Sequence, residues 1–241
     1  MPREPQPPQS RRSSNRLLAT LSPEALDRLR PEVVVTRCGE VLQEGHVTPS
    51  HVLFPDLGTM VSVVRTDESG GTVEVAVVGG DGATPLQSAL ASLPTRSEAI
   101  AQVPGPMTRV RTEAVRQAFA SEEAFRNAVL LYSSIYVDHV SQNAVCNRLH
   151  PLEGRLSKWL LVSRRFVGSD TLELTHDFLS HMLGVRRAGV TVAINELAKD
   201  GLIGHARGAI TITDPEGLER RACECEQVVR EGWERLMKLE P

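Results

Sequence analysis

The sequence lacks long apolar runs, a secretory signal and a regular cysteine framework. No run of about 18 apolar residues occurs, so no segment is expected to span a membrane. The opening residues MPREPQPPQSRRSSN have no apolar core of the kind that a signal peptide needs, and their Pro, Arg and Ser content predicts a disordered arm over residues 1–15. The four cysteines follow no regular spacing, which indicates a reducing, cytoplasmic setting.

Catalytic motifs and a strong excess of positive charge are also missing. The chain contains no Walker loop and no Gly-x-Ser-x-Gly, His-Glu-x-x-His or Ser-His-Asp pattern, so we expect no enzymatic activity. The net charge of −3 argues against a basic coat for nucleic acid over the whole surface. Residues 184–212, however, carry four basic and two acidic residues, so DNA contact is expected only through one local face, as in a sequence-specific dimer.

Residues 172–213 have the pattern of two helices joined by a tight turn and followed by a hairpin. Thr175 is placed to cap the first helix, whose apolar residues recur at helical spacing up to Leu183. Gly184 ends this helix and permits the sharp turn that follows. A second helix is predicted over about 186–200. Its inner face consists of Val190, Ala193, Ile194 and Leu197.

The same segment ends in two short predicted strands, 202–203 and 209–213, around a turn at 205–208, which together form a wing. Two helices separated by a short turn containing glycine are typical of a helix-turn-helix. The alternative is an arbitrary helical hairpin in some core. That interpretation leaves Arg186 and Arg187 at the exposed start of the second helix without a role, whereas DNA binding uses them directly.

These residues resemble the C-terminal domain of the Crp/Fnr superfamily of bacterial transcription regulators. The resemblance rests on RLSKWLL, LTHDFLSHMLGVRR, VTVAINELAKDGLI and GAITITD within residues 151–213, and it is looser over the first half. It implies an α+β fold with an N-terminal cyclic-nucleotide-binding-like β-roll, a long central dimerisation helix and a C-terminal winged helix-turn-helix. It also implies double-stranded DNA as a partner, and we expect RNA polymerase as a further one.

The first half has the pattern of a small β-domain, expected over residues 16–120. A helix is predicted over residues 15–30, with a second start inside it where Ser22 precedes Pro23. From Val33 the apolar period changes to two, and short strands alternate with Gly-rich turns, which indicates a roll or barrel. The predicted strands are 33–36, 41–42, 52–54, 59–65, 72–78, 99–103 and 108–111, followed by a helix over 112–120.

The resemblance to the cyclic-nucleotide-binding fold weakens at the phosphate-binding cassette. In that fold a Gly-Glu pair is followed by an Arg-Ser or Arg-Thr pair that clamps the cyclic phosphate. This chain has Gly82-Ala83 in place of Gly-Glu, and Arg96-Ser97 stands farther along the sequence. Arginine suits phosphate, but Arg96 can equally be a surface residue or a partner of Glu98. We therefore predict no cofactor and no cyclic-nucleotide response, and expect another effector or none.

Residues 121–149 contain neither Gly nor Pro and predict one helix of roughly 43 Å, with Ser121 as its cap. The apolar face of this helix is wider than packing against one β-domain requires. We therefore expect one stripe of apolar residues to form a homodimer seam and the neighbouring stripe to pack against the β-roll. The alternative is a helix buried within a single globule. The predicted seam consists of Phe125, Val129, Tyr132, Tyr136, Val140 and Asn143.

The pair His150-Pro151 ends the long helix, since the residue before a proline is driven out of the α region. We expect a hinge here, followed by a DNA-binding domain over residues 150–214. Its first helix, 152–167, is predicted to bury Leu156, Trp159 and Leu160 against the helix pair. Residues 215–241 predict one C-terminal helix.

Cys223 and Cys225 lie within that predicted C-terminal helix. At a spacing of two residues their thiols would point roughly 200° apart, and no Cys or His stands nearby to complete four ligands, so no metal site is predicted. The N-terminal cysteine cluster of the iron–sulfur members of the superfamily is missing as well. Redox sensing through Cys38 or Cys146 stays open.

The function expected from the sequence is that of a cytoplasmic, homodimeric transcription regulator that binds a palindromic operator. Its DNA contacts are expected at the starts of the two helices, along the exposed face of the second helix and in the wing. The residues are Thr175, His176, Arg186, Arg187, Ala188, Thr191, Asn195 and Arg207. The alternative is a ligand-binding or protein-interaction module whose winged helix no longer binds DNA.

Overall fold

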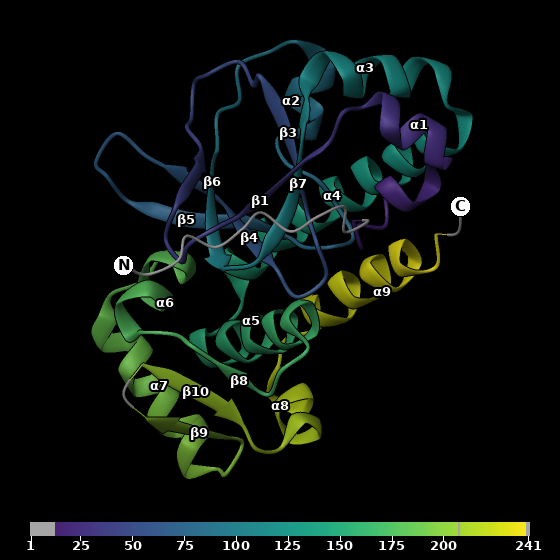
Figure 1. The fold of residues 1–241 in the computed structure, drawn as a ribbon. Coiled ribbons are helices and arrows are strands. Elements are labelled where there is room, and N and C mark those ends of the chain that lie inside the picture. The colour runs from purple at the N-terminus through teal and green to yellow at the C-terminus, as the bar shows by residue number, and fades with distance from the viewer. Residues whose placement is uncertain (1–12, 207, 240–241) are drawn as a thin grey trace, which may run out of the picture.

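The computed structural model describes residues 13–206 and 208–239, which form an N-terminal β-domain, a long helix and a C-terminal domain of helices and one small sheet (Figure 1). The α+β architecture predicted from the sequence is confirmed. Most of the predicted arm lies outside the described residues, but the prediction of disorder is wrong for residues 13–15. The side-chain amide of the buried Asn15 donates hydrogen bonds to the carbonyl oxygens of Pro55, at 2.9 Å, and Gly82, at 2.8 Å.

The β-domain begins with two short helical segments, η1 (Leu18–Thr20) and α1 (Pro23–Arg28), in place of the single helix predicted over 15–30. Leu21 has extended backbone, which interrupts the helix, and the Ser22 hydroxyl accepts a hydrogen bond from the Ala25 N–H at 3.2 Å. The predicted internal helix start at Ser22 is thus confirmed. The apolar side chains of this segment cover the β-domain core.

Two antiparallel sheets make up the rest of the β-domain. The first has the order β1 (Glu32–Val35), β7 (Pro106–Arg111) and β3 (His51–Pro55). The second has the order β2 (Val41–Gln43), β6 (Glu98–Val103), β4 (Met60–Thr66) and β5 (Thr72–Val78). All seven strands match strands predicted from the period-two pattern.

A short helix, α2 (Leu86–Ala91), lies between β5 and β6 and was not predicted. It has only six residues and no side-chain cap, since Pro85 stands at its N-cap, so the sequence carries little local signal for it. Its Leu86 and Ala89 are buried in the core that also contains α1 and the start of the long helix.

Helix α3 (Thr112–Ser121) is followed by the long helix α4 (Glu123–Leu149). Ser121 is the last residue of α3 and not the predicted cap of α4, because the break falls at Glu122, which has extended backbone. The boundary of the predicted helix is therefore wrong by two residues at its start.

The dimer seam predicted on α4 is wrong, because that stripe packs inside its own chain. Phe125, Val129 and Tyr132 are buried in a core shared with the β-domain, and the Tyr132 hydroxyl donates to the carbonyl of Ala83 at 2.8 Å. Helical periodicity identifies which residues share a stripe, but it cannot tell whether that stripe faces the same chain or a second copy.

A different stripe of α4 is exposed. The large apolar side chains on it, Leu130, Val137, Val145 and Leu149, are 42 to 68% accessible and stand seven, eight and four residues apart, so they lie on one side of the helix. The exposed residues of this stripe are Leu130, Ser134, Val137, Ser141, Ala144, Val145, Arg148 and Leu149.

The C-terminal domain begins with α5 (Leu152–Val167). Helices α6 (His176–Leu183) and α7 (Arg187–Lys199) follow the short strand β8 (Thr171–Leu172), and β9 (Ile203–Ala206) and β10 (Ala209–Ile212) complete a sheet in the order β8-β10-β9. The prediction of a single C-terminal helix is wrong. Two helices, α8 (Pro215–Arg221) and α9 (Cys225–Met237), are separated by extended backbone at Ala222.

Helix α5 joins the two halves of the molecule. Its Leu156 and Leu160, as predicted, are buried in one apolar core with α6 and α7, and that same core contains Met60 of β4 and Val77 of β5. The indole N–H of Trp159 donates to the Glu74 carboxylate at 2.9 Å. The C-terminal domain therefore packs directly against the second sheet (Figure 1).

Glu74 is the buried acidic group at this contact. Burial raises the pKa of Glu74 to about 7, although hydrogen bonds from Ser62 and Trp159 and the charge of Lys158 oppose the rise. In the unfolded chain a glutamate has a pKa near 4.3, so the folded state binds the proton more tightly. The contribution of Glu74 to stability is therefore highest below about pH 4.3 and falls as the pH rises towards about 7.

We predict that tryptophan fluorescence of the folded chain titrates with a midpoint near pH 7, because the ionisation of Glu74 changes the partner of the Trp159 indole N–H. Glu74→Gln should abolish this titration. Glu68→Gln, at an exposed position in the turn before β5, is the matched control and should leave it unchanged. If the fluorescence change near pH 7 persists in Glu74→Gln, another ionisable group causes it.

Candidate nucleic-acid interface

Helices α6 and α7 form the helix-turn-helix with the local geometry that the sequence predicted. The Thr175 hydroxyl accepts a hydrogen bond from the Phe178 N–H at 3.1 Å and so caps α6. Gly184 ends α6 with φ +63°, in the left-handed region that favours glycine. Ser180 is buried where the two helices meet. The inward residues predicted for α7, namely Val190, Ala193, Ile194 and Leu197, are all buried.

The outer face of α7 carries several of the predicted DNA contacts. Arg186 stands at the N-cap, and Arg187, Ala188 and Asn195 are exposed along the helix. Val192, which is 59% accessible, lies on the same exposed face. Glu196 is the one acidic residue of α7 and lies one turn before Lys199.

Thr191 is placed differently from its neighbours. Its side chain is half-buried, and its hydroxyl bonds to the carbonyl of Arg187 at 3.2 Å and to the His176 ring at 3.0 Å. The structure thus brings two predicted contact residues, His176 and Thr191, into one hydrogen-bonded pair. We infer that Thr191 positions the His176 ring more directly than it reads a base.

His205 of β9 is a residue at this surface that the sequence did not indicate. Its ring centroid lies 6.3 Å from that of His176, and His205 is exposed near the turn of the wing. Partial burial and the nearby His205 and Arg187 lower the pKa of His176. Only the pairing of β9 with β10 places His205 there, so no local sequence pattern could have identified it. Arg207, the contact predicted in the wing, lies outside the described residues.

The predicted ligand pair of the β-domain lies at a groove against α4. Arg96 is exposed and Ser97 half-buried at this groove of about 500 Å³, which Arg65 and Tyr136 also line. Ala83, which replaces the glutamate of the phosphate cassette, is buried, and its carbonyl is bonded to Tyr132. The helix α2 lies in the chain between Ala83 and Arg96 and accounts for their wide separation in sequence.

The cysteines of the C-terminal segment have partners that the sequence did not reveal. Cys223 and Cys225 lie beside Cys146 and His150 from the end of α4, and one ligand atom from each of the four residues lies within 4.8 Å of the others. Both premises of the prediction of no metal site are wrong: Cys223 is not helical, and two further ligand-type side chains are close in space.

Among the described residues, no helix is long and apolar enough to cross a membrane. The arrangement defines a class of protein: a winged helix-turn-helix with an exposed basic start to its second helix, joined through a long helix to a β-roll with a groove.

Comparison with known proteins agrees with this class. Residues 154–221 match the Crp-like helix-turn-helix domain family. FixK2 from Bradyrhizobium japonicum has a similar structure, with a TM-score of 0.68 and 15% identity over 80% of this chain and 98% of FixK2. A transcriptional regulator of the CRP/FNR family from Thermus thermophilus is also similar, with a TM-score of 0.64 and 20% identity over 79% of this chain and 98% of the other. No curated protein sequence matches significantly.

The resemblance inferred from the sequence is therefore confirmed. The chain carries a Crp-like helix-turn-helix domain and has the fold of the Crp/Fnr transcription regulators.

Proposed function

We propose that the chain is a cytoplasmic, homodimeric transcription regulator that binds a palindromic DNA operator and has no enzymatic activity. The observation that carries this proposal is the two-sided α7: its inner face is buried, and its outer face presents Arg187, Ala188 and Asn195 to solvent. Arginine binds guanine edges or phosphates, and asparagine pairs with adenine in the major groove. RNA polymerase remains a predicted further partner on the basis of the family resemblance.

The exposed residues of α7 favour DNA recognition through a few charged contacts together with apolar contacts to thymine methyl groups. Ala188 and Val192 can contact thymine methyl groups but offer no hydrogen bond to a base. Arg186 and Arg187 at the start of the helix supply the charged contacts, and Asn195 a polar contact two turns later. Sequence preference should then depend on few hydrogen bonds, with Arg187 the leading one.

The homodimer is proposed through the exposed stripe of α4 defined above. Leu130 and Val137 are 55 and 58% accessible, and they lie seven residues apart on one face of a 27-residue helix. Pairing two such helices would remove both side chains from water and would place two recognition helices about one DNA turn apart, or a multiple of it. This geometry supports a palindromic operator.

The rival proposal is a ligand-binding or protein-interaction module whose winged helix no longer binds DNA. The acidic Glu196 and the small number of basic residues on α7 are the features in its favour. A chain that dimerises but shows no selection of any duplex would support it.

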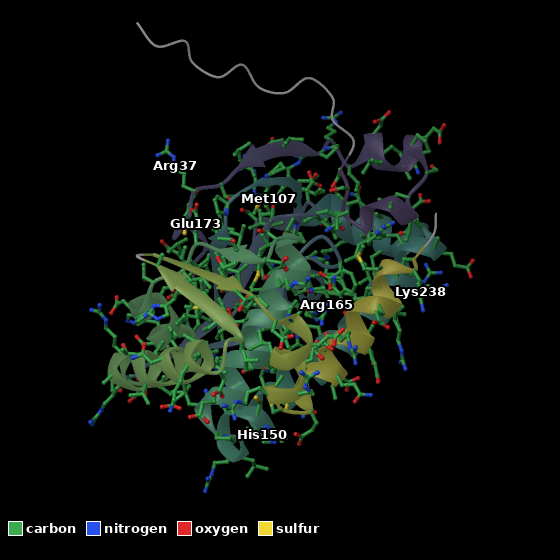
Figure 2. The ribbon with its side chains drawn as sticks, turned by 90° about the horizontal axis from the view of Figure 1, so that it is seen from below. Arg37, Met107, His150, Arg165, Glu173 and Lys238 are labelled. Carbon is green, nitrogen blue, oxygen red and sulfur yellow. The ribbon has the colours of Figure 1, made fainter. Side chains whose placement is uncertain are left out.

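We predict that Arg187→Ala reduces sequence preference by about 1–3 kcal/mol, or roughly 5- to 150-fold, because a bidentate contact to a base is lost. Selection of bound duplexes from random DNA, followed by titration of selected and scrambled sites, measures this. Arg37→Ala, at an exposed position of the β-domain, is the matched control and should bind as the wild type does (Figure 2). If Arg187→Ala keeps full preference, Arg187 does not read a base.

Salt dependence tests the phosphate contacts separately. If the dimer makes roughly six to ten phosphate contacts, affinity should fall on the order of a thousandfold or more from about 50 to about 200 mM salt. Binding that is indifferent to salt would contradict a DNA-binding function of this surface.

We predict that Val137→Asp yields monomers, because it places two like charges in the helix pair. Sedimentation at micromolar concentration measures the assembly. Val35→Asp, which changes an equally apolar exposed side chain on β1 (69% accessible), is the control and should leave the dimer intact. A wild-type chain that is monomeric under these conditions would exclude the proposed seam.

We propose that cyclic nucleotides are not the effector, because the buried Ala83 supplies no carboxylate for a ribose hydroxyl. Calorimetry with cyclic AMP and cyclic GMP should give no saturable binding at micromolar concentrations. Saturable binding that Arg96→Ala abolishes would overturn this prediction and assign the groove to such ligands.

A further inference from the structure

Four side chains of ligand type meet where α4 ends. Cys146 lies in the last turn of α4 and His150 at its C-cap, while Cys223 lies in the break between α8 and α9 and Cys225 begins α9. The Sγ atoms of Cys146 and Cys223 are 3.5 Å apart, and Cys225 Sγ is 3.3 Å from His150 Nδ1. No other group of three or more Cys, His, Asp or Glu residues in the described ranges has comparable geometry.

The backbone explains how the four side chains converge. Cys146 and His150 are four residues apart, so they lie on the same face at the end of the helix. Extended backbone at Ala222 ends α8 and turns the chain towards α4. The N–H of Cys223 then donates to the carbonyl of Gly154 at 3.4 Å, which holds the break against the start of α5.

We propose that Cys146, His150, Cys223 and Cys225 bind one zinc ion. In tetrahedral zinc sites the Zn–S distance is about 2.3 Å and the Zn–N distance about 2.0 Å, which puts neighbouring ligand atoms roughly 3.5–3.8 Å apart. The two measured separations are within a few tenths of an ångström of that range. Three thiolates and an imidazole are a common structural zinc set, and an all-protein set of four leaves no open position for catalysis.

The compactness of the group distinguishes a single ion from an iron–sulfur cluster. A cluster is held by ligands on several iron atoms, so its cysteines stand farther apart than ligands that share one ion. Here one ligand atom of each residue lies within 4.8 Å of all the others. Soft thiolate ligands in tetrahedral arrangement favour zinc over magnesium, calcium or manganese.

The surroundings suit a bound ion. With Nδ1 facing the cysteines, His150 Nε2 is 3.0 Å from the Glu224 carboxylate, the carboxylate–histidine pairing that orients zinc-binding imidazoles. The amide of Gln142 donates to Cys225 Sγ at 3.0 Å. Arg155 and Lys158 line a cavity with Cys146, and their positive charges offset the net −1 of three thiolates and one zinc ion.

A disulfide between Cys146 and Cys223 is the rival interpretation of the short sulfur–sulfur distance. It would use two of the four side chains and would give no role to Cys225, to His150 or to the pairing of His150 with Glu224. The zinc ion accounts for all of these contacts together.

The site would connect the hinge to the C-terminal helix. His150 lies between α4 and α5 (Figure 2), and α9 runs back along α4 (Figure 1). Gly232 of α9 packs against Ile135 of α4, and Leu236 is buried with the β-domain. Bound zinc would therefore fix the end of α4 relative to α8 and α9, and through them the orientation of the DNA-binding domain.

The test uses the full chain, purified under reducing conditions, stripped with a chelator and reloaded with zinc. We expect about one zinc per chain by elemental analysis, and with cobalt(II) in its place the visible absorption of a tetrahedral site with thiolate-to-metal charge transfer. Cys223→Ser and Cys225→Ser should lose the charge-transfer intensity and stoichiometric zinc. Cys38→Ser, an exposed cysteine of the β-domain, is the matched control and should retain both.

Glu224→Gln tests the site without removing a ligand. Loss of the Glu224 carboxylate that contacts His150 should weaken zinc binding about 10- to 100-fold. Competition with a chelator of known affinity measures this change. Glu219→Gln, an exposed residue of α8, should not change it. Failure of the reduced wild type to bind zinc stoichiometrically would overturn the proposal, as would a Cys146–Cys223 disulfide in the native chain. Neither result would contradict the proposed function, because DNA binding is measured separately.

Discussion

The burial of α5 on nearly all sides is the constraint on which the rest of the structure depends. This helix contacts the second sheet through Trp159 and Glu74, the helix-turn-helix through Arg155 and the carbonyl of Leu183, and α9 through the ion pair of Arg165 with Glu226. Buried arginines and lysines are tolerated only when such partners satisfy them. The orientation of the C-terminal domain is therefore set by specific polar contacts as well as by the apolar core.

Helix α4 combines three surfaces that differ in chemistry. One face is buried in the β-domain, and Tyr136 on its flank lines the groove with Arg96. The opposite face exposes the apolar stripe proposed as the seam, and the C-terminal end carries Cys146. One helix therefore connects the groove, the exposed stripe and the cysteine cluster.

The exposed surface of α7 is not purely polar. Gly189, in its first turns, faces Leu152 of α5, and an added Cβ would lie 3.3 Å from the leucine side chain. An alanine at this position would require the Leu152 side chain to move by a few tenths of an ångström. Ala188 and Val192 are exposed on α7 next to the basic residues at its start, so its solvent-facing side is part apolar and part basic.

The sequence by itself determined the local features: the caps at Ser22 and Thr175, the turn at Gly184, the strands and the helix-turn-helix, because each depends on neighbouring residues. Tertiary structure alone decided which face of α4 is buried and where α2 forms. It also brought Cys223 to Cys146, 77 residues away in the chain. Periodicity records that a face is apolar but not what covers it, and a cluster of ligands from separate segments exists only once α8, α9 and α4 have packed together.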